Sequence, residues 1–153
     1  MTVIYKQTTN LMTKKLALLP LIFLAISCKT YTIAPENFKK QFISDNANNL
    51  KDVEVNNPIF KYAAIKYQAN TLKYLNVYDK KGKLEFIQNS PSVEIRVTLK
   101  DGTRKNLYLD TVTLENDTLK GEKSRILHLK SKIPFAQIAK IEVQEAGKKY
   151  EYK

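Results

Sequence analysis

A single cysteine, Cys28, is the residue whose surroundings in the sequence indicate chemistry most clearly. It follows the apolar run Leu16–Ile26, which begins directly after Lys14 and Lys15. A positive start, a short apolar stretch and a small residue before the cut are typical of a secretory signal peptide. The run is roughly half of the about 20 residues that a membrane-spanning helix needs, so the pattern favours a cleaved signal. A thiolate at its end is the strong nucleophile that alkylation requires, and this position disfavours a buried structural cysteine.

The residues that end this run, Leu24-Ala25-Ile26-Ser27-Cys28, resemble the lipobox of bacterial lipoproteins. The resemblance covers the signal region alone, and Ala25 stands where leucine is usual. It implies that residues 1–27 are removed and that the Cys28 sulfur carries a diacylglycerol. Two or three acyl chains hold a protein firmly on a membrane, whereas one chain is marginal. Because Lys29, not aspartate, follows the cysteine, we expect a lipid-anchored protein of the cell envelope at the outer membrane of a Gram-negative bacterium.

The charge of the chain is strongly positive, with 26 Lys and Arg against 15 Asp and Glu among 153 residues, or +11. Removal of residues 1–27 takes away Lys6, Lys14 and Lys15, which lowers the net charge to +8. Such a balance favours anionic lipid or glycan as a contact, although surplus lysine can also simply keep a surface soluble. A secreted protein meets little nucleic acid, so no nucleic-acid partner is expected. With its one cysteine modified, the mature chain must rely on a hydrophobic core for stability.

Catalytic and cofactor motifs are missing from the sequence. His128 is the sole histidine, and a strand-surface position explains it better than a catalytic triad or a zinc site. No G-x-S-x-G, H-E-x-x-H, P-loop or G-x-G-x-x-G pattern occurs, and the four glycines offer little material for a phosphate-binding loop. We therefore predict no catalytic residue, no metal site and no cofactor, and expect a protein that is not an enzyme.

Two groups of acidic residues could in principle form a site. Glu115-Asn116-Asp117 with Glu122 could in principle ligate calcium, but the spacing is not that of an EF-hand and a solvated turn is favoured. Asp110 falls inside an expected strand, either as a buried acid that needs a partner or as an outward-facing residue. Paired with Glu94 it could serve glycoside cleavage, but the sequence does not bring the two together.

The elements expected to carry these residues divide the chain after the signal into two parts. Residues 28–56 are predicted to be a lipid-anchored leader, a tether with one loosely packed helix over 36–44 whose face carries Phe38, Phe42 and Ile43. Residues 57–153 are predicted to be an antiparallel β domain. Asn57-Pro58 could cap a helix, and the segment 59–68 fits a helical stripe as well as a strand.

From residue 72 onward the apolar residues alternate, which predicts short strands. A hairpin is expected over 72–79 and 84–88 around Lys80-Lys81-Gly82-Lys83, and the clearest strand is 93–99. Asp101-Gly102 should turn the chain into a strand over 104–114, and 118–121 should be a further connection. Later strands are expected over 125–130, 140–144 and 150–152. A single turn at 133–138 should precede the strand over 140–144. The prediction is a mainly β fold, a small antiparallel sandwich or an SH3-like barrel with one or two short helices.

The sequence therefore favours a non-enzymatic, membrane-anchored envelope protein that acts by binding or as a structural component. Lysine and tyrosine alternate at Lys61-Tyr62, Lys66-Tyr67, Lys73-Tyr74 and 148–153, a pattern that suits anionic head groups or sugars, or simply protects exposed strands. One alternative is an immunity or inhibitor protein that neutralises a protein partner. A second, less favoured, is a glycan or cell-wall hydrolase.

Overall fold

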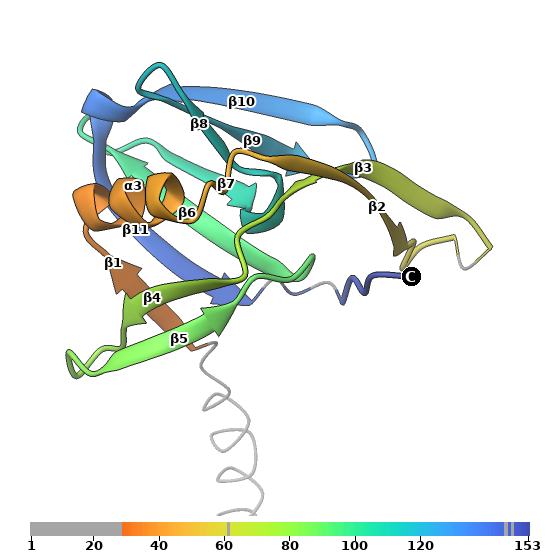
Figure 1. Ribbon diagram of the computed structural model, residues 1–153, viewed down its shortest axis with the longest axis horizontal. Coiled ribbons are helices and arrows are strands. Elements are labelled where there is room, and N and C mark those ends of the chain that lie inside the picture. The colour runs from red at the N-terminus through yellow and green to blue at the C-terminus, as the bar shows by residue number, and fades with distance from the viewer. Residues whose placement is uncertain (1–28, 61, 146, 148) are drawn as a thin grey trace, which may run out of the picture.

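The computed structural model describes residues 29–60, 62–145, 147 and 149–153, so the expected signal 1–27 and Cys28 lie outside the described residues (Figure 1). In chain order the elements are β1 (Thr30–Ile33), α3 (Pro35–Ser44), β2 (Leu50–Asn56), β3 (Ala64–Asn70), β4 (Tyr74–Tyr78), β5 (Leu84–Gln88), β6 (Val93–Leu99), β7 (Arg104–Tyr108), the 3₁₀ turn η2 (Leu109–Thr111), β8 (Thr113–Glu115), β9 (Thr118–Ser124), β10 (Leu129–Pro134), the 3₁₀ turn η3 (Phe135–Gln137) and β11 (Ile138–Glu145). No helix in this part of the chain is long and apolar enough to cross a membrane.

The strands form open antiparallel sheets. A six-stranded sheet has the order β5-β4-β1-β11-β6-β7, a three-stranded sheet the order β10-β9-β8, and β2 pairs with β3. The larger two lie in separate layers, and the β2–β3 hairpin projects to one side of them (Figure 1). The predicted mainly β, antiparallel fold with a short helix is confirmed. The sheets are open, so they do not close into an SH3-like barrel.

The main core lies between the two larger sheets. Alternate residues of β6 are buried from Val93 to Leu99, as the alternating sequence predicts, and Leu119 of β9 and Ile133 of β10 meet them from the other layer. Gly121 of β9 lets these layers approach, because a Cβ there would lie 3.3 Å from Leu107 Cδ1 of β7 in the six-stranded sheet. The alternation of apolar residues therefore marks the inner face of the sheet, as expected.

The segment predicted to be a leader is an integral part of the fold from residue 30 onward, so that prediction is wrong there. β1 lies inside the six-stranded sheet between β4 and β11, with Ile33 opposite Ile141. The predicted helix is present, with Pro35 in its first turn. Its Phe38 and Phe42 are fully buried and stack 4.7 Å apart, so the helix is not loosely packed. β1 pairs with a strand that lies about a hundred residues later, and such pairing leaves no local signal.

The segment 59–68, left open between helix and strand, contains the start of β3, which begins at Ala64. Asn57 does not cap a helix. Its side chain accepts hydrogen bonds from the backbone N–H groups of Ile59 (2.9 Å) and Phe60 (3.0 Å), which fixes the turn between β2 and β3. The segment also matched the spacing of a helix because the alanines at positions 63 and 64 fit helical spacing as well as strand alternation.

Two predicted boundaries around β9 are wrong. The expected connection over 118–121 lies within β9, and the turn comes earlier, where Asn116 and Asp117 adopt φ of 47° and 54°. Asn and Asp tolerate this left-handed backbone better than other non-glycine residues. The expected strand over 125–130 starts only at Leu129, because residues 125–128 form the β9–β10 turn. Apolar letters suggested a strand there, yet Leu127 is 68% exposed.

Candidate functional site

An ion pair between Asp110 and Arg125 is completely buried. Asp110 lies in η2 and Arg125 in the turn after β9, and Arg125 Nη2 is 2.6 Å from Asp110 Oδ1. The same Nη2 donates to the carbonyl oxygen of Pro91 at 2.7 Å. Neither side chain has any exposed surface. Removing two charges from water is costly unless further hydrogen bonds and contacts compensate, so the surroundings of this pair decide its role.

Tyrosine side chains supply that compensation. The Arg125 Cζ atom lies 4.0 Å from the ring centre of Tyr108 and 4.5 Å from that of Tyr67, with Tyr150 at 5.3 Å. A guanidinium over aromatic faces is attracted to their π electrons, most strongly without water. These tyrosines belong to a second apolar cluster, separate from the main core. Arg125 Nε and Nη1 have no hydrogen-bond partner among the described residues, so ring contact takes the place of hydrogen bonding there.

The second carboxylate oxygen of Asp110 holds the β2–β3 hairpin and the C-terminal segment. It accepts hydrogen bonds from the hydroxyl groups of Tyr67 in β3, at 2.5 Å, and Tyr152, at 3.0 Å. Tyr152 also bridges to Val55 of β2 through the backbone. The buried pair therefore joins η2, the β9–β10 turn, the hairpin and the chain end in one assembly.

The phenol groups of Tyr67, Tyr108 and Tyr152 remain proton donors at neutral pH. Burial raises the pKa of Tyr67 and of Tyr152, and the negative charge of Asp110 raises both further. Burial and a hydrogen bond with Tyr150 raise the pKa of Tyr108. A phenol with a raised pKa is a poor nucleophile and a poor general acid. The assembly positions elements and does not itself supply reactive groups.

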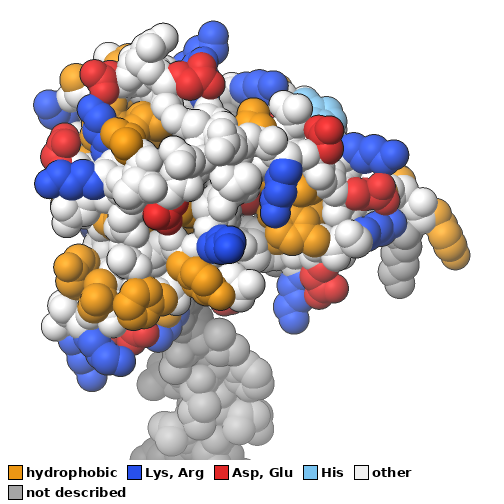
Figure 2. Space-filling view, viewed as in Figure 1, with side chains coloured by type: hydrophobic (Ala, Val, Ile, Leu, Met, Phe, Trp, Pro, Cys, Tyr) orange, Lys and Arg blue, Asp and Glu red, His pale blue; other side chains and the backbone are white. Residues whose placement is uncertain are grey.

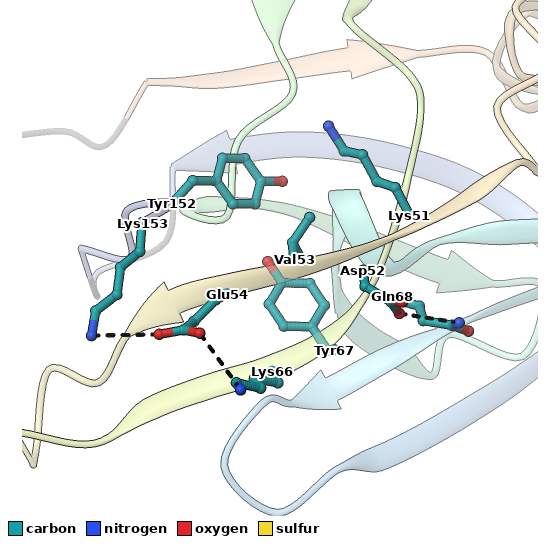
Figure 3. A pocket seen from close by; sticks show the side chains of 9 residues that line it. All are labelled: Lys51, Asp52, Val53, Glu54, Lys66, Tyr67, Gln68, Tyr152 and Lys153. Atoms are coloured by element: carbon teal, nitrogen blue, oxygen red, sulfur yellow. Dashed lines mark hydrogen bonds and ion pairs between the residues drawn. The ribbon is translucent and has the colours of Figure 1, made fainter.

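A groove opens above two of these tyrosines, between the hairpin and the chain end (Figure 3). Its lining residues are Lys51, Asp52, Val53, Glu54, Lys66, Tyr67, Gln68, Tyr152 and Lys153. Glu54 lies between two lysines, 3.9 Å from Lys66 Nζ and 3.7 Å from Lys153 Nζ (Figure 3). The groove is open to solvent and carries charges of both signs. Such a surface suits contact with another macromolecule better than enclosure of a small molecule.

The end of the same hairpin carries large apolar side chains in solvent. Ile59, Phe60 and Tyr62 are 59%, 63% and 104% exposed, and the Asn57 side chain holds the backbone of Ile59 and Phe60. Figure 2 shows apolar side chains at the end of the projecting hairpin, away from the main body. Contiguous exposed apolar residues are typical of interaction sites. The hairpin therefore combines an apolar tip with a charged groove at its base.

The acidic residues predicted to cluster are separated. Glu115 and Asp117 are exposed on the β8–β9 turn, where they pair with Lys120 and Lys39, which confirms the solvated turn. Glu122 is buried instead, and its Oε2 atom has no hydrogen-bond partner among the described residues. Burial raises the pKa of Glu122. In the part of the chain that the structure describes, no three His, Cys, Asp or Glu side chains are grouped as metal ligands.

His128 and Asp110 differ from their expected surroundings. His128 is exposed in the β9–β10 turn with φ of 48°, so it does not lie on a strand face. Of the two interpretations of Asp110, the buried acid with a partner is correct, and it sits in η2 after β7 ends. Because both Asp110 oxygens are engaged and buried, this acid is not available to a substrate, and the pairing with Glu94 for glycoside cleavage has no support.

The sequence analysis missed Arg125 and the tyrosines around it. A single arginine next to Ile126 and Leu127, in a chain with nine tyrosines and no tryptophan, was the one available signal. Cys28, the predicted lipidation site, lies outside the described residues. Searches against protein families, curated proteins and solved structures found no match to this chain.

Proposed function

We propose that this chain is a lipid-anchored, non-enzymatic binding protein of the bacterial cell envelope. Cys28 would carry the lipid, with Lys29 favouring the outer membrane. The β2–β3 hairpin would contact a protein partner. The lipobox resemblance supports the anchor, and the exposed hairpin tip supports the binding role. The charged groove at the hairpin base would contribute specificity.

The observation that carries the binding role is an apolar tip on a firmly mounted hairpin. Tyr67 of β3 is fixed to Asp110, and Asn57 is 8% exposed because its side chain is occupied in the turn. A preorganised loop loses less conformational entropy on binding, which raises affinity. The backbone of Ile59 and Phe60 at the exposed tip is thus held by hydrogen bonds to Asn57. The tip has the construction expected of a contact site.

A protein is favoured over a glycan as partner because of the side chains at the tip. Ile59 is aliphatic, and sugars are recognised chiefly by aromatic faces and polar groups. Large apolar and aromatic residues at the centre of a patch, with charges at its rim, are typical of protein interfaces. Here Phe60 and Tyr62 provide the centre, and the groove with Lys66 and Glu54 provides the rim.

Site-specific photocrosslinking in the native host tests the hairpin. With a photoreactive residue at position 62 we expect one discrete adduct, and the adduct should weaken about tenfold when Ile59→Ser and Phe60→Ser are added. The matched control is the same photoreactive residue at Leu127, which is equally apolar and 68% exposed on another turn. A tip that yields no adduct, or the same adducts as position 127, would contradict the binding role.

Palmitate labelling tests the anchor separately. Palmitate labelling should disappear in Cys28→Ala, because no other cysteine exists in the chain. Retention of the lipid in that variant would refute the anchor.

An immunity or inhibitor protein is the special case in which the partner is a toxin or an enzyme. The mixed charges of the groove favour such a partner over a purely apolar contact.

A further inference from the structure

We propose that the β4–β5 end of the six-stranded sheet is the face that lies against the membrane, and that it binds the anionic surface of the bilayer. This end comprises the turn Lys80–Lys83 and the exposed residues Tyr78, Leu84 and Phe86. The proposal rests on the proposed lipid at Cys28. It goes beyond the anchor because it assigns a binding surface on the folded domain and sets its orientation.

The proposed lipid lies close to the fold along the chain. Only Lys29 stands between Cys28 and Thr30, where β1 begins, and two residue steps span at most about 7 Å. β1 is hydrogen-bonded to β11 over its whole length and bridges to β4, so it cannot peel away as a tether. A lipid on Cys28 therefore brings the surface around the start of β1 to the head groups.

The start of β1 lies beside the β4–β5 turn. β1 and β4 are antiparallel with Thr32 opposite Tyr78, so residue 30 lies level with the turn that follows β4. A hydrogen bond with Tyr31 raises the pKa of Lys29, and the nearby charges of Glu85 and Asp79 raise it further. Figure 1 shows the β4–β5 turn and the start of β1 at the same edge of the fold. The head groups would thus meet this hairpin first.

The β4–β5 end exposes large apolar side chains. Tyr78 pairs with Leu84, and Phe86 is the next residue on the same face of β5. Their side chains are 42%, 45% and 65% exposed. Figure 2 shows apolar side chains gathered over the β4–β5 end with lysine or arginine beside them.

Four lysines lie at this edge, at positions 29, 80, 81 and 83, against the carboxylates of Asp79 and Glu85. The Asp79 carboxylate accepts hydrogen bonds from the backbone N–H groups of Lys81 and Lys83, and Glu85 pairs with Lys83 at 2.9 Å, so both acids are engaged within the hairpin. Aromatic rings at head-group level with lysine beside them are the side chains that anionic interfaces prefer. The edge is therefore complementary in charge and in polarity to an anionic bilayer surface.

Vesicle sedimentation measures this surface without the lipid. The probe is the mature chain from residue 28 with Cys28→Ser, mixed with phosphatidylglycerol–phosphatidylcholine vesicles or with pure phosphatidylcholine. We expect binding to the anionic vesicles only. The Lys80→Gln and Lys81→Gln changes should each lower the partition coefficient about fivefold, since a lysine near the surface contributes about 1 kcal/mol. Phe86→Asp should lower it at least tenfold.

Matched controls carry the same changes on the other sheet and the β9–β10 turn. They are Lys130→Gln, Lys132→Gln and Leu127→Asp, all at exposed positions distant from the β4–β5 end in Figure 1. Unaltered binding in the controls with loss in the β4–β5 variants supports the proposal. Absence of binding to anionic vesicles, or equal losses in both sets, would overturn it.

A second readout uses the anchored protein and separates the two proposals. When Cys28 carries lipid, Phe86→Cys or Leu127→Cys introduces a single thiol for an environment-sensitive dye. Emission should shift to the blue at position 86 alone. If palmitate is present on Cys28 but the dye at position 86 reports water, the membrane-facing surface is wrong while the anchor stands. If no palmitate is found, the anchor fails, and the sedimentation result still decides whether the surface binds lipid.

Discussion

Loss of one partner of the buried Asp110–Arg125 pair should destabilise the fold strongly, whereas loss of both partners together should destabilise it little. In Asp110→Asn the guanidinium stays inside the protein without its counter-ion, and two of its nitrogens already lack hydrogen-bond partners among the described residues. In Arg125→Met the carboxylate is left with the two tyrosine hydroxyls alone. Removing one partner of a buried ion pair costs about 3–5 kcal/mol of unfolding free energy, and we expect this range for each single variant.

The double variant Asp110→Asn with Arg125→Met separates the pair from its packing. Replacing both charges by neutral groups of similar size removes the desolvation cost together with the attraction, so such changes are often neutral or stabilising. We expect the double variant to lose at most about 2 kcal/mol, less than either single variant. The coupling free energy in this cycle should therefore be at least about 4 kcal/mol, above the roughly 0.5–3 kcal/mol usual for residues in contact.

Urea unfolding, followed by circular dichroism, measures these free energies. The control is the exposed pair of Glu115 and Lys120, whose atoms are equally close at 2.5 Å but whose side chains are 52% and 37% exposed. Glu115→Gln should cost no more than about 1 kcal/mol, because water screens an exposed pair. Losses below 1 kcal/mol in both single variants at Asp110 and Arg125, or additivity in the double variant, would refute the reasoning.

Four further predictions concern other parts of the fold. Phe42→Ala should cost about 3–5 kcal/mol in urea unfolding, since it leaves a cavity under the helix that the sequence placed in a leader. Gly121→Ala should cost about 1–3 kcal/mol by the same assay, because the new methyl group would crowd Val112 between the sheets. Asn57→Ala should remove about 1–2 kcal/mol and speed amide exchange at the hairpin tip, measured by mass spectrometry. The pKa of Glu122 is raised, so the folded protein keeps a proton on this carboxyl group that the unfolded chain loses. Stability should therefore fall as pH rises above about 4.5. Glu122→Gln should abolish that fall in unfolding experiments from pH 4 to 8.

The sequence predicted the elements whose signal is local. Alternation identified β6 from Val93 to Leu99, and the Lys80–Lys83 turn identified the β4–β5 hairpin, where Gly82 adopts φ of +79°. The helix predicted over 36–44, which begins one residue earlier at Pro35, and the turn before β11 were also found from short patterns. In each case neighbouring residues alone determine the backbone, so no knowledge of distant contacts was needed.

The remainder could not be read because it depends on distant residues. β1 is a four-residue strand whose partners lie in β4 and β11, and nothing in its sequence marks it as central. Arg125 lies in a turn, where arginine is normally exposed, and its burial requires tyrosines from three other parts of the chain. The fold class was therefore predictable, whereas the assembly that fixes the candidate site was not.

The Asp110–Arg125 pair fixes the position of the β2–β3 hairpin in a way that apolar side chains of equal stability would not. Apolar packing tolerates small shifts, so a hairpin held by Val55 and Ile65 alone could settle in more than one position on the body. Asp110 accepts one hydrogen bond from Tyr67 and one from Tyr152 on the same oxygen, which fixes the hairpin and the chain end in one arrangement. The proposed membrane surface is on the six-stranded sheet and the proposed contact tip is on this hairpin. A fixed angle between them would present the tip to its partner in one orientation relative to the bilayer, so variants that loosen the pair should weaken crosslinking at position 62 even when the domain remains folded.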